Sequence, residues 1–237
     1  MPATDKPRLQ VDNLQAWYDE SHVLHGMTLN VGDGEIVTLI GRNGAGKTTT
    51  MRAIMGVLRK RQGTIRYKDQ DIVALAPHKV PRLGIGYVPE ERGIFASLNV
   101  IENLTLPPVT QPGGMSLNEI FALFPNLQGR NRTIGTRLSG GEQQMLAIAR
   151  VLRSGADFIL LDEPTEGLAP VIVDQIAVSL QILKQRGLTI LLVEQNLQFA
   201  SAIADRHYVV EQGEVVDEVQ NHALAANMGK LNAYLGV

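Results

Sequence analysis

Residues 35–48 constrain the fold of this chain more than any other segment does. Residues 35–40, EIVTLI, form a short apolar and β-branched run, which is typical of a strand buried on both faces of a sheet. The run continues directly into the glycine-rich segment 41–48, GRNGAGKT, and residues 49–58 are compatible with a helix. A buried strand, a tight loop and a helix in immediate succession favour an α/β fold.

The glycine-rich loop fits the pattern Gly-x4-Gly-Lys-Thr in the strand-to-helix context that a phosphate-binding loop requires. Its glycines allow backbone N–H groups to turn inward around phosphate oxygens, and the following helix adds the positive end of its dipole. We expect Lys47 to reach the β- and γ-phosphates of a nucleotide and the Thr48 hydroxyl to bind Mg²⁺. The predicted nucleotide-binding residues of the loop are Gly41, Arg42, Asn43, Gly44, Ala45, Gly46, Lys47, Thr48 and Thr49. By itself the motif indicates only a P-loop NTPase, and a plain strand–helix connection is the alternative.

The chain around this loop divides into a β-rich start, a helical middle and an α/β end. Loose apolar alternation near the N-terminus predicts an antiparallel β layer, whereas short helices are expected between residues 90 and 154. Strand character returns at 158–161 and 189–193, with a helical stretch between them. We therefore predict one domain over residues 1–237, with an α/β core (a mixed sheet with flanking helices) of residues 1–89 and 155–237 and an inserted, mainly helical subdomain of residues 90–154.

Composition and charge exclude several classes of protein. A hydrophobic content of 44% and a charged content of 19% are ordinary for a globular chain, and a net charge of −2 gives no argument for nucleic acid as a partner. The absence of cysteine excludes disulfides and thiolate metal sites. No apolar run reaches about 18 residues, so we expect that this chain does not span a bilayer. If the chain serves transport, another chain must supply the path.

A pair of carboxylates follows the predicted strand at residues 158–161. A buried strand can place Asp162 at its carboxyl end, beside the phosphate-binding loop, where open α/β sheets bind ligands. We predict that Asp162 holds Mg²⁺, directly or through water, and that Glu163 polarises the attacking water as a general base. The alternative is a pair of solvated acids at a strand end.

Residues 138–144, LSGGEQQ, form a Ser/Gly turn at the start of a predicted helix. The Ser139 hydroxyl and the backbone N–H groups of Gly140 and Gly141 would make a second anion site, unless the turn is only a helix cap. One nucleotide does not need two such sites on one domain. The second site is therefore expected to serve the nucleotide of a neighbouring subunit.

The LSGGEQQ segment resembles the signature of ABC ATPases, and it lies between the two other motifs in the order of that family. The resemblance covers essentially the whole chain and implies an ATPase that binds ATP and Mg²⁺, peripheral to the cytoplasmic face of the cell membrane. It also implies head-to-tail pairing of two subunits. The signature residues that would then contact the partner's ATP are Ser139, Gly140, Gly141 and Glu142. Tyr18 matches the aromatic residue that stacks on adenine in this family, with Trp17 as its rival.

Three positions depart from the commonest pattern of the family. Glu90 stands where most members have a glutamine, and its carboxylate could contact Mg²⁺ or a water bound to it. Gln195 replaces the usual switch histidine; it can donate a hydrogen bond but cannot become cationic, so we expect slow hydrolysis. Ala169 replaces a common aspartate in a loop that communicates across the dimer. The predicted catalytic residues are Glu163, Gln195 and Lys47, and the predicted metal ligands are Thr48, Asp162 and Glu90.

The segments IGRNGAGKTT, YVPEERGIF, LSGGEQQMLAIAR, FILLDEPTEGLAP and LLVEQN together resemble the LivF-type ATPases of branched-chain amino acid importers. This resemblance implies an ATP-hydrolysing subunit that energises uptake of branched-chain or related hydrophobic amino acids. Its implied partners are a second, different ABC ATPase, two integral membrane permease subunits and, indirectly, a substrate-binding protein. The alternatives are the ATPase of another importer, such as a urea importer, or of a lipid-export system. A non-transport ABC ATPase acting on nucleic acid or ribosomes is less favoured, and no nucleic acid is expected as a partner.

An apolar loop follows Glu90, with Ile94, Phe95, Leu98 and Val100 in succession. In the family that the sequence resembles, this region forms the groove for a coupling helix of the membrane subunit. Docking of an amphipathic helix in an apolar groove is an ordinary mode of recognition. Packing of Ile94 and Phe95 inside the helical insert is the alternative.

Overall fold

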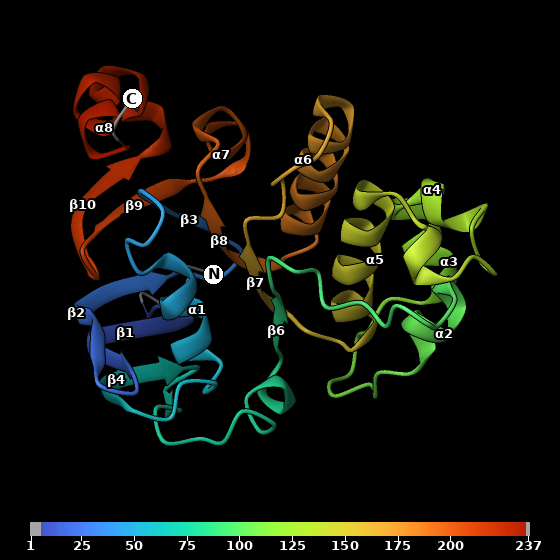
Figure 1. Cartoon of the computed structure of the whole chain (residues 1–237), viewed down its shortest axis with the longest axis horizontal. Helices are drawn as coiled ribbons and strands as arrows, with labels where there is room; N and C mark the ends of the chain where they lie inside the picture. Colours follow the sequence, from blue (N-terminus) through green and yellow to red (C-terminus); the bar gives the residue numbers. More distant parts are fainter. Residues whose placement is uncertain (1–5, 236–237) are drawn as a thin grey trace.

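A computed structural model describes residues 6–235 of the chain, in two sheets with helices around them (Figure 1). The larger sheet has six strands in the order β10-β9-β3-β8-β7-β6. Its strands pair in parallel from β9 to β6, and β10 is antiparallel to β9 at one edge. These strands are β3 (Ile36–Ile40), β6 (Ile85–Val88), β7 (Phe158–Asp162), β8 (Thr189–Glu194), β9 (Arg206–Glu211) and β10 (Glu214–Gln220).

The smaller sheet is the antiparallel layer that the N-terminal alternation predicts. Its strand order is β2-β1-β4-β5. The strands are β1 (Leu9–Tyr18), β2 (Ser21–Val31), β4 (Arg61–Tyr67) and β5 (Gln70–Asp71). Helix α1 (Lys47–Ile54) contributes Met51 and Ile54 to a core that also contains Leu14, Leu24 and Leu39. The shared core fixes α1, and with it the loop that precedes the helix, against both sheets (Figure 1).

The other face of the large sheet is covered by α5 (Gly140–Arg153), α6 (Pro170–Gln185) and α7 (Leu197–Ile203). Three shorter helices pack against α5: α2 (Val100–Thr105), α3 (Leu117–Leu123) and α4 (Pro125–Gln128). Helices α2, α3 and α5 each begin with a reciprocal capping box, which satisfies two backbone N–H groups at the helix start. A second core joins Leu146 of α5 and Ile176 of α6 to Leu161 and Ile190 of the sheet.

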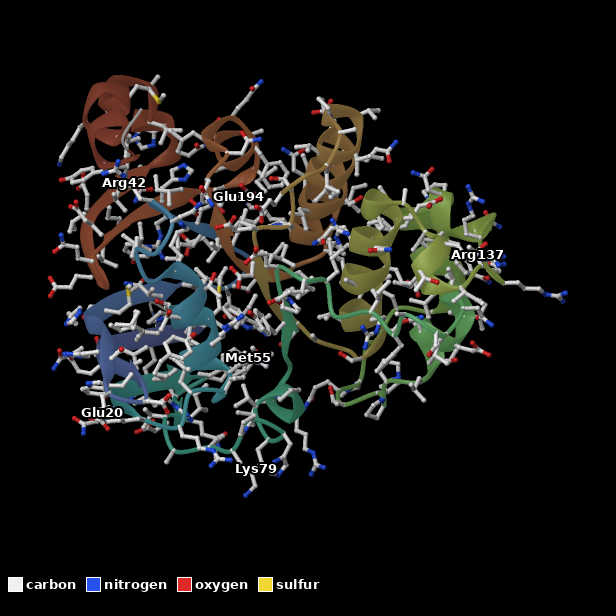
Figure 2. The ribbon with its side chains drawn as sticks, in the orientation of Figure 1. Glu20, Arg42, Met55, Lys79, Arg137 and Glu194 are labelled. Atoms are coloured by element: carbon white, nitrogen blue, oxygen red, sulfur yellow. The ribbon has the colours of Figure 1, made fainter. Side chains whose placement is uncertain are left out.

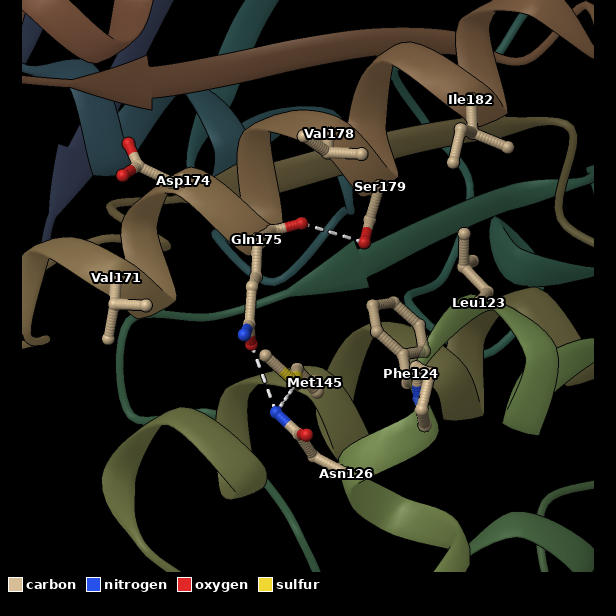
Figure 3. A pocket seen from close by; sticks show the side chains of 11 residues that line it. Leu123, Phe124, Asn126, Met145, Val171, Asp174, Gln175, Val178, Ser179 and Ile182 are labelled. Atoms are coloured by element: carbon tan, nitrogen blue, oxygen red, sulfur yellow. Dashed lines mark hydrogen bonds between the residues drawn. The ribbon is translucent and has the colours of Figure 1, made fainter.

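Helix α6 meets the helices α3–α5 across a groove of about 410 Å³ (Figure 3). Asn126 donates a hydrogen bond from Nδ2 to Oε1 of Gln175, at 2.9 Å, across this groove. Phe124 and Met145 form part of its apolar lining. Helix α6 therefore packs against the α3–α5 region with space left between them.

The C-terminal segment closes the β10 side of the large sheet. Helix α8 (Met228–Leu235) follows two short 3₁₀ turns, and Leu224 and Leu231 pack with Ile40, Val209 and Val219. Over residues 6–235, no helix combines the length and the apolar character needed to cross a membrane. The sheet order, the helices and the N-terminal layer confirm the predicted fold class.

Candidate nucleotide-binding site

The glycine-rich loop connects the end of β3 to the start of α1, as the sequence predicts. Two of its glycines are required by close contacts. A Cβ on Gly41 would lie 2.2 Å from the carbonyl oxygen of Val210, and Gly46 has a φ of +107° with Leu24 Cδ2 2.9 Å from its Cβ position. Any larger residue at these positions would displace the loop from the helix start that it precedes.

A cavity of about 360 Å³ lies at this loop. Its lining consists of Val23, Asn43, Gly44, Gly46, Lys47, Thr48, Thr49, Glu90, Glu163 and Glu166. Gly41, Arg42 and Ala45 belong to the same loop but are not part of that lining; Figure 2 shows Arg42 on the connection between β3 and α1. The cavity thus brings predicted phosphate-binding residues together with two of the predicted acidic residues, Glu90 and Glu163.

Lys47 is buried at the start of α1. Its Nζ donates hydrogen bonds to the carbonyl oxygens of Gly41, at 2.7 Å, and Arg42, at 2.9 Å, and lies 3.9 Å from Oε1 of Glu163. Burial lowers the pKa of the Lys47 ammonium, and the charges of Glu163 and Asp162 oppose that shift. The ammonium is therefore a desolvated cation within reach of the cavity, which suits a phosphate oxygen as its partner.

Asp162 ends β7, and both of its carboxylate oxygens accept hydrogen bonds. The Thr48 hydroxyl donates to Oδ1 at 2.9 Å, and the Tyr87 hydroxyl donates to Oδ2 at 3.0 Å. Burial raises the pKa of Asp162, while these two hydrogen bonds act in the opposite direction. A hydroxyl and a carboxylate oxygen side by side are hard ligands that fit Mg²⁺, which takes its remaining ligands from water and phosphate.

Within residues 6–235 there is no cluster of three or more histidine, cysteine, aspartate or glutamate side chains that could hold a metal ion. Glu90 lines the cavity, and burial together with the charges of Glu166, Glu163 and Asp162 raises its pKa. That Glu90 contacts the metal stays a prediction.

Glu163 and Gln195 are in direct contact, although 32 positions separate them in the sequence. Gln195 Nε2 lies 2.8 Å from each carboxylate oxygen of Glu163 and donates to them. The Glu163 backbone has a φ of +45°, an unusual conformation for a residue with a side chain, and its N–H donates to the carbonyl oxygen of Val193 at 3.0 Å. The structure therefore aims the Glu163 carboxylate into the cavity at the cost of local backbone strain.

Two residues that sequence reasoning missed hold this arrangement in place. Tyr87 is the donor to Asp162. Glu194, at the end of β8 (Figure 2), is only 2% exposed; its carboxylate accepts from the Thr165 hydroxyl at 2.6 Å and from the N–H groups of Gln195 and Asn196 at 3.0 Å each. A charged residue at the end of an otherwise apolar strand was the available signal for Glu194.

The signature segment lies elsewhere on the molecule, at the start of α5. Ser139 caps this helix by accepting a hydrogen bond from the Glu142 N–H at 3.3 Å, and the Glu142 carboxylate accepts from the Ser139 N–H at 2.7 Å. A Cβ on Gly141 would lie 2.6 Å from Ile172 Cγ2, so α6 packs closely on this turn. Within the part of the chain that the structure describes, none of the residues 139–142 lines the cavity at the glycine-rich loop.

Tyr18, the predicted adenine-stacking residue, lies at the end of β1 and is 38% exposed. Its hydroxyl accepts a hydrogen bond from Arg52 Nη1 on α1, at 3.5 Å. Trp17 is stacked on His22 instead, with ring centroids 4.3 Å apart. The Tyr18 ring is therefore linked to the helix that follows the phosphate-binding loop, whereas one face of Trp17 is already covered.

Comparisons with known proteins agree with this geometry. Residues 24–166 match the sequence profile of the ABC transporter family. The chain is 40% identical to the high-affinity branched-chain amino acid transport ATP-binding protein BraG of Pseudomonas aeruginosa, over 96% of this chain and 99% of that protein. It is 36% identical to the lipopolysaccharide export system ATP-binding protein LptB of Escherichia coli K12, over 88% of each chain.

Among solved structures, the chain resembles the ADP conformation of MJ1267, an ATP-binding cassette of an ABC transporter. The TM-score is 0.83 with 25% sequence identity, and the match covers 98% of this chain and 100% of that chain. Together with the matching profile and relatives, this likeness confirms the family that the motifs indicate. The chain belongs to the ABC transporter family and is one of its nucleotide-binding ATPase subunits.

Proposed function

We propose that this chain is the ATPase subunit of an importer for branched-chain or related hydrophobic amino acids. The observation that carries the chemistry is the convergence of Lys47, Thr48 and Glu163 on one cavity, with Asp162 hydrogen-bonded to Thr48. The substrate class is supported by the name and the 40% identity of BraG, since this chain and that relative match over nearly their full lengths.

In the proposed reaction, Lys47 leaves the carbonyl oxygens of its own loop and binds the β- and γ-phosphates, where its desolvated charge acts more strongly than in water. Thr48 and Asp162 would hold Mg²⁺, and the bound ion would neutralise charge on the phosphates. Glu163 accepts a proton of the attacking water as the water oxygen bonds to the γ-phosphorus, while the bond from that phosphorus to the bridging oxygen breaks and ADP leaves. The Gln195 amide, which contacts Glu163, then donates a hydrogen bond to the reacting phosphate. Tyr18 stacks on the adenine ring.

We further propose that this chain pairs head to tail with a second, different ABC ATPase. The signature residues 139–142 lie outside the cavity of their own chain, which supports a role toward the ATP of a neighbour. Gln195 and Ala169 depart from the commonest family pattern, and Ala169, the residue before α6, forms no side-chain cap for that helix. A partner ATPase that carries the usual histidine and aspartate at these positions would complete the second nucleotide site.

The proposed docking surface for the membrane subunits is a groove of about 540 Å³ on residues of the proposed helical subdomain (90–154) and of the core next to it. We call it the basic groove; its walls include Pro81, Arg82, Pro89, Arg92, Pro108 and Arg150. Phe95 lies nearby and is 39% exposed, and the centroid of its ring is 4.3 Å from Cζ of Arg150. Val100, by contrast, is fully buried, and Ile94 packs against the second core, as in the alternative in which Ile94 packs inside the insert.

A transport assay tests the proposed function. The chain is purified from its native host with its membrane subunits and reconstituted, and ATP-driven leucine uptake is measured beside ATP hydrolysis. Glu163→Gln should bind Mg-ATP normally but lower both rates by about 10²–10⁴-fold, since it removes the general base. Brisk hydrolysis by Glu163→Gln would contradict the assigned base. Hydrolysis that no branched-chain amino acid stimulates would contradict the assigned substrate class.

The similarity to LptB supports a second candidate, an ATPase that drives lipid export. The same purification distinguishes the two functions, because the ATPase site would be the same in both and only the partner proteins would differ. Recovery of lipid-export subunits, in place of an amino-acid permease and a second ATPase, would favour the export function. Recovery of only self-paired ATPase with a permease would contradict the proposed heterodimer.

A further inference from the structure

Two segments around the basic groove are bonded into a single unit. The first is the loop of residues 89–99, which borders the groove; the second is the signature turn, residues 135–139, which leads into α5. The Gly135 N–H donates to the carbonyl oxygen of Leu98 at 2.9 Å, and the Thr136 N–H donates to that of Ala96 at 3.1 Å. A displacement of the loop is therefore transmitted to the backbone that carries Ser139.

Arg92 connects the groove itself to the signature helix. It lines the groove, and its Nη1 donates a hydrogen bond at 3.0 Å to Oε1 of Gln143, in the first turn of α5. Its guanidinium also packs against the turn, since a Cβ on Gly140 would lie 3.3 Å from Nη2. The Arg92 backbone has a φ of +65°, a strained conformation for a residue other than glycine. Strain of this kind persists where the surroundings hold a side chain in a required place.

Gln143 passes this contact on to the signature turn. Its Nε2 donates to the carbonyl oxygens of Gly135, at 3.1 Å, and Leu138, at 3.2 Å. The orientation of the amide is fixed by these neighbours, because its oxygen faces the Arg92 donor and its nitrogen faces two acceptors. The Gln143 amide thus links the Arg92 guanidinium to Gly135 and Leu138, two residues of the signature turn.

We propose that Arg92 is a positioning residue: through it, a segment of the membrane subunit bound in the basic groove sets the position of the signature turn. A side chain inserted beside Arg92 shifts the guanidinium, Gln143 follows through its hydrogen bond, and residues 135–139 move with it. Ser139 and Gly141 then approach or leave the ATP of the neighbouring subunit. The inference rests on the proposed function, in which the groove receives a membrane subunit and the signature serves the partner's nucleotide.

The absence of cysteine from the sequence allows a test on the full chain without any partner. A single cysteine at His78, an exposed residue of the groove lining, is labelled with pyrene maleimide so that an apolar group occupies the groove. Hydrogen–deuterium exchange is then followed in a peptide covering residues 135–143. Labelling should change exchange there by about fivefold, the factor that one hydrogen bond contributes. The change should disappear in Arg92→Ala and in Gln143→Ala.

Arg130→Ala is the matched control. Arg130 contacts Glu142 of the same helix turn, with its Nε 3.1 Å from Oε1, but it is not part of the groove lining. This variant should keep the full response to the label. An unresponsive signature turn in the labelled chain, or a response that survives in both Arg92→Ala and Gln143→Ala, would overturn the proposal. If Arg92→Ala fails to fold, Gln143→Ala decides the outcome.

Mg-ATP binding is measured on the same samples to separate this inference from the proposed function. Arg92→Ala should bind Mg-ATP as tightly as the unaltered chain, because Arg92 does not line the cavity at the glycine-rich loop. Failure of the unaltered chain to bind Mg-ATP would count against the proposed function. The exchange data would still decide whether the groove and the signature turn are linked through Arg92.

Discussion

The Glu163 carboxylate is the proposed general base, yet both of its oxygens accept hydrogen bonds from the Gln195 amide. Glutamine cannot take up a proton, so this contact has the same charge at every pH. A histidine in its place could become cationic and stabilise the charge that develops on the phosphate. The strained backbone of Glu163 and the neutral side chain of Gln195 therefore favour a site in which the carboxylate is firmly positioned but ATP hydrolysis is slow.

Gln195→His should raise kcat for ATP hydrolysis by about tenfold, and by more at pH 6 than at pH 8, because the imidazole is cationic at the lower pH. Steady-state hydrolysis across this pH range checks the expectation. The double variant with Glu163→Gln is the control and should stay inactive. An unchanged or lowered kcat in Gln195→His would show that charge at position 195 does not limit the reaction.

Tyr87→Phe tests how Asp162 is held. Burial raises the pKa of the Tyr87 hydroxyl, so it remains a protonated donor to Oδ2 of Asp162. Its removal should raise the Mg²⁺ concentration for half-maximal activity by about 10-fold, as is typical for partners of metal ligands, and should change kcat little at saturating Mg²⁺. Tyr67→Phe is a matched control, since Tyr67 is also buried and donates to an aspartate, Asp157, at 2.9 Å. Equal Mg²⁺ dependence in the two variants would contradict the role of Tyr87.

At the scale of elements, the sequence predicts most of the fold because its signals are local. The continuous apolar runs at 158–161 and 189–193 lie within β7 and β8, and the predicted helical stretch between them is α6. The glycine-rich loop is equally local, which is why its residues were predictable. Helix α7, which has seven residues, was not predicted.

The contacts that support the site are long-range, and this is why the sequence did not predict them. Tyr87, Asp162 and Glu194 come together because β6, β7 and β8 are adjacent in the sheet, with their carboxyl ends at the same edge. The order of the strands along the sequence does not show which strands are neighbours in the sheet. Thr165 similarly reaches Glu194 across 29 positions. Sequence reasoning therefore found the residues that carry a motif and missed those that position them.

Strand β9 contains a buried pH-sensitive group, His207. Its Nδ1 lies 2.6 Å from the Thr38 hydroxyl oxygen, and its Nε2 lies 3.0 Å from Oδ1 of Asn221, which joins β3 to the C-terminal segment. Burial lowers the pKa of His207, while its hydrogen bond to Asn221 opposes that shift. The unfolded chain therefore binds a proton more readily than the folded chain does. Stability should be fully present above the unfolded pKa of about 6.5 and should fall as the pH drops below it.

Urea unfolding between pH 8 and pH 5 measures this effect. The free energy of unfolding should decrease below about pH 6.5, and part of the decrease should vanish in His207→Gln, which keeps a polar side chain but does not titrate. A pH profile that is identical in the two chains would show that protonation of other groups causes the loss. His222→Gln, an exposed residue in the same C-terminal region, is the matched control.

At the scale of the whole molecule, charge is distributed very unevenly for a chain with a net charge of −2. Residues 57–82 contain seven lysines and arginines against two aspartates, a net +5, so the remaining residues together carry −7. The basic groove contains one arginine of this segment, Arg82, together with Arg92 and Arg150, and its described lining includes no aspartate or glutamate. In Figure 2, Met55 of the groove lies near the middle of the molecule, and Lys79 lies at its lower edge.

The uncompensated charge predicts that the membrane subunit presents an acidic segment to the groove. Arg82→Glu should weaken assembly with the membrane subunits and should remove most of its salt dependence, because exposed charge pairs are screened by salt. Phe95→Asp should weaken assembly at every salt concentration, since it removes exposed apolar contact area and places there a charge that assembly would bury. Co-purification at about 50 and 500 mM salt measures both effects.

The control is Arg66→Glu, because Arg66 is an exposed residue of β4 outside the groove lining; this variant should assemble normally. If Arg66→Glu and Arg82→Glu weaken assembly equally, the attraction depends on total charge and not on the groove.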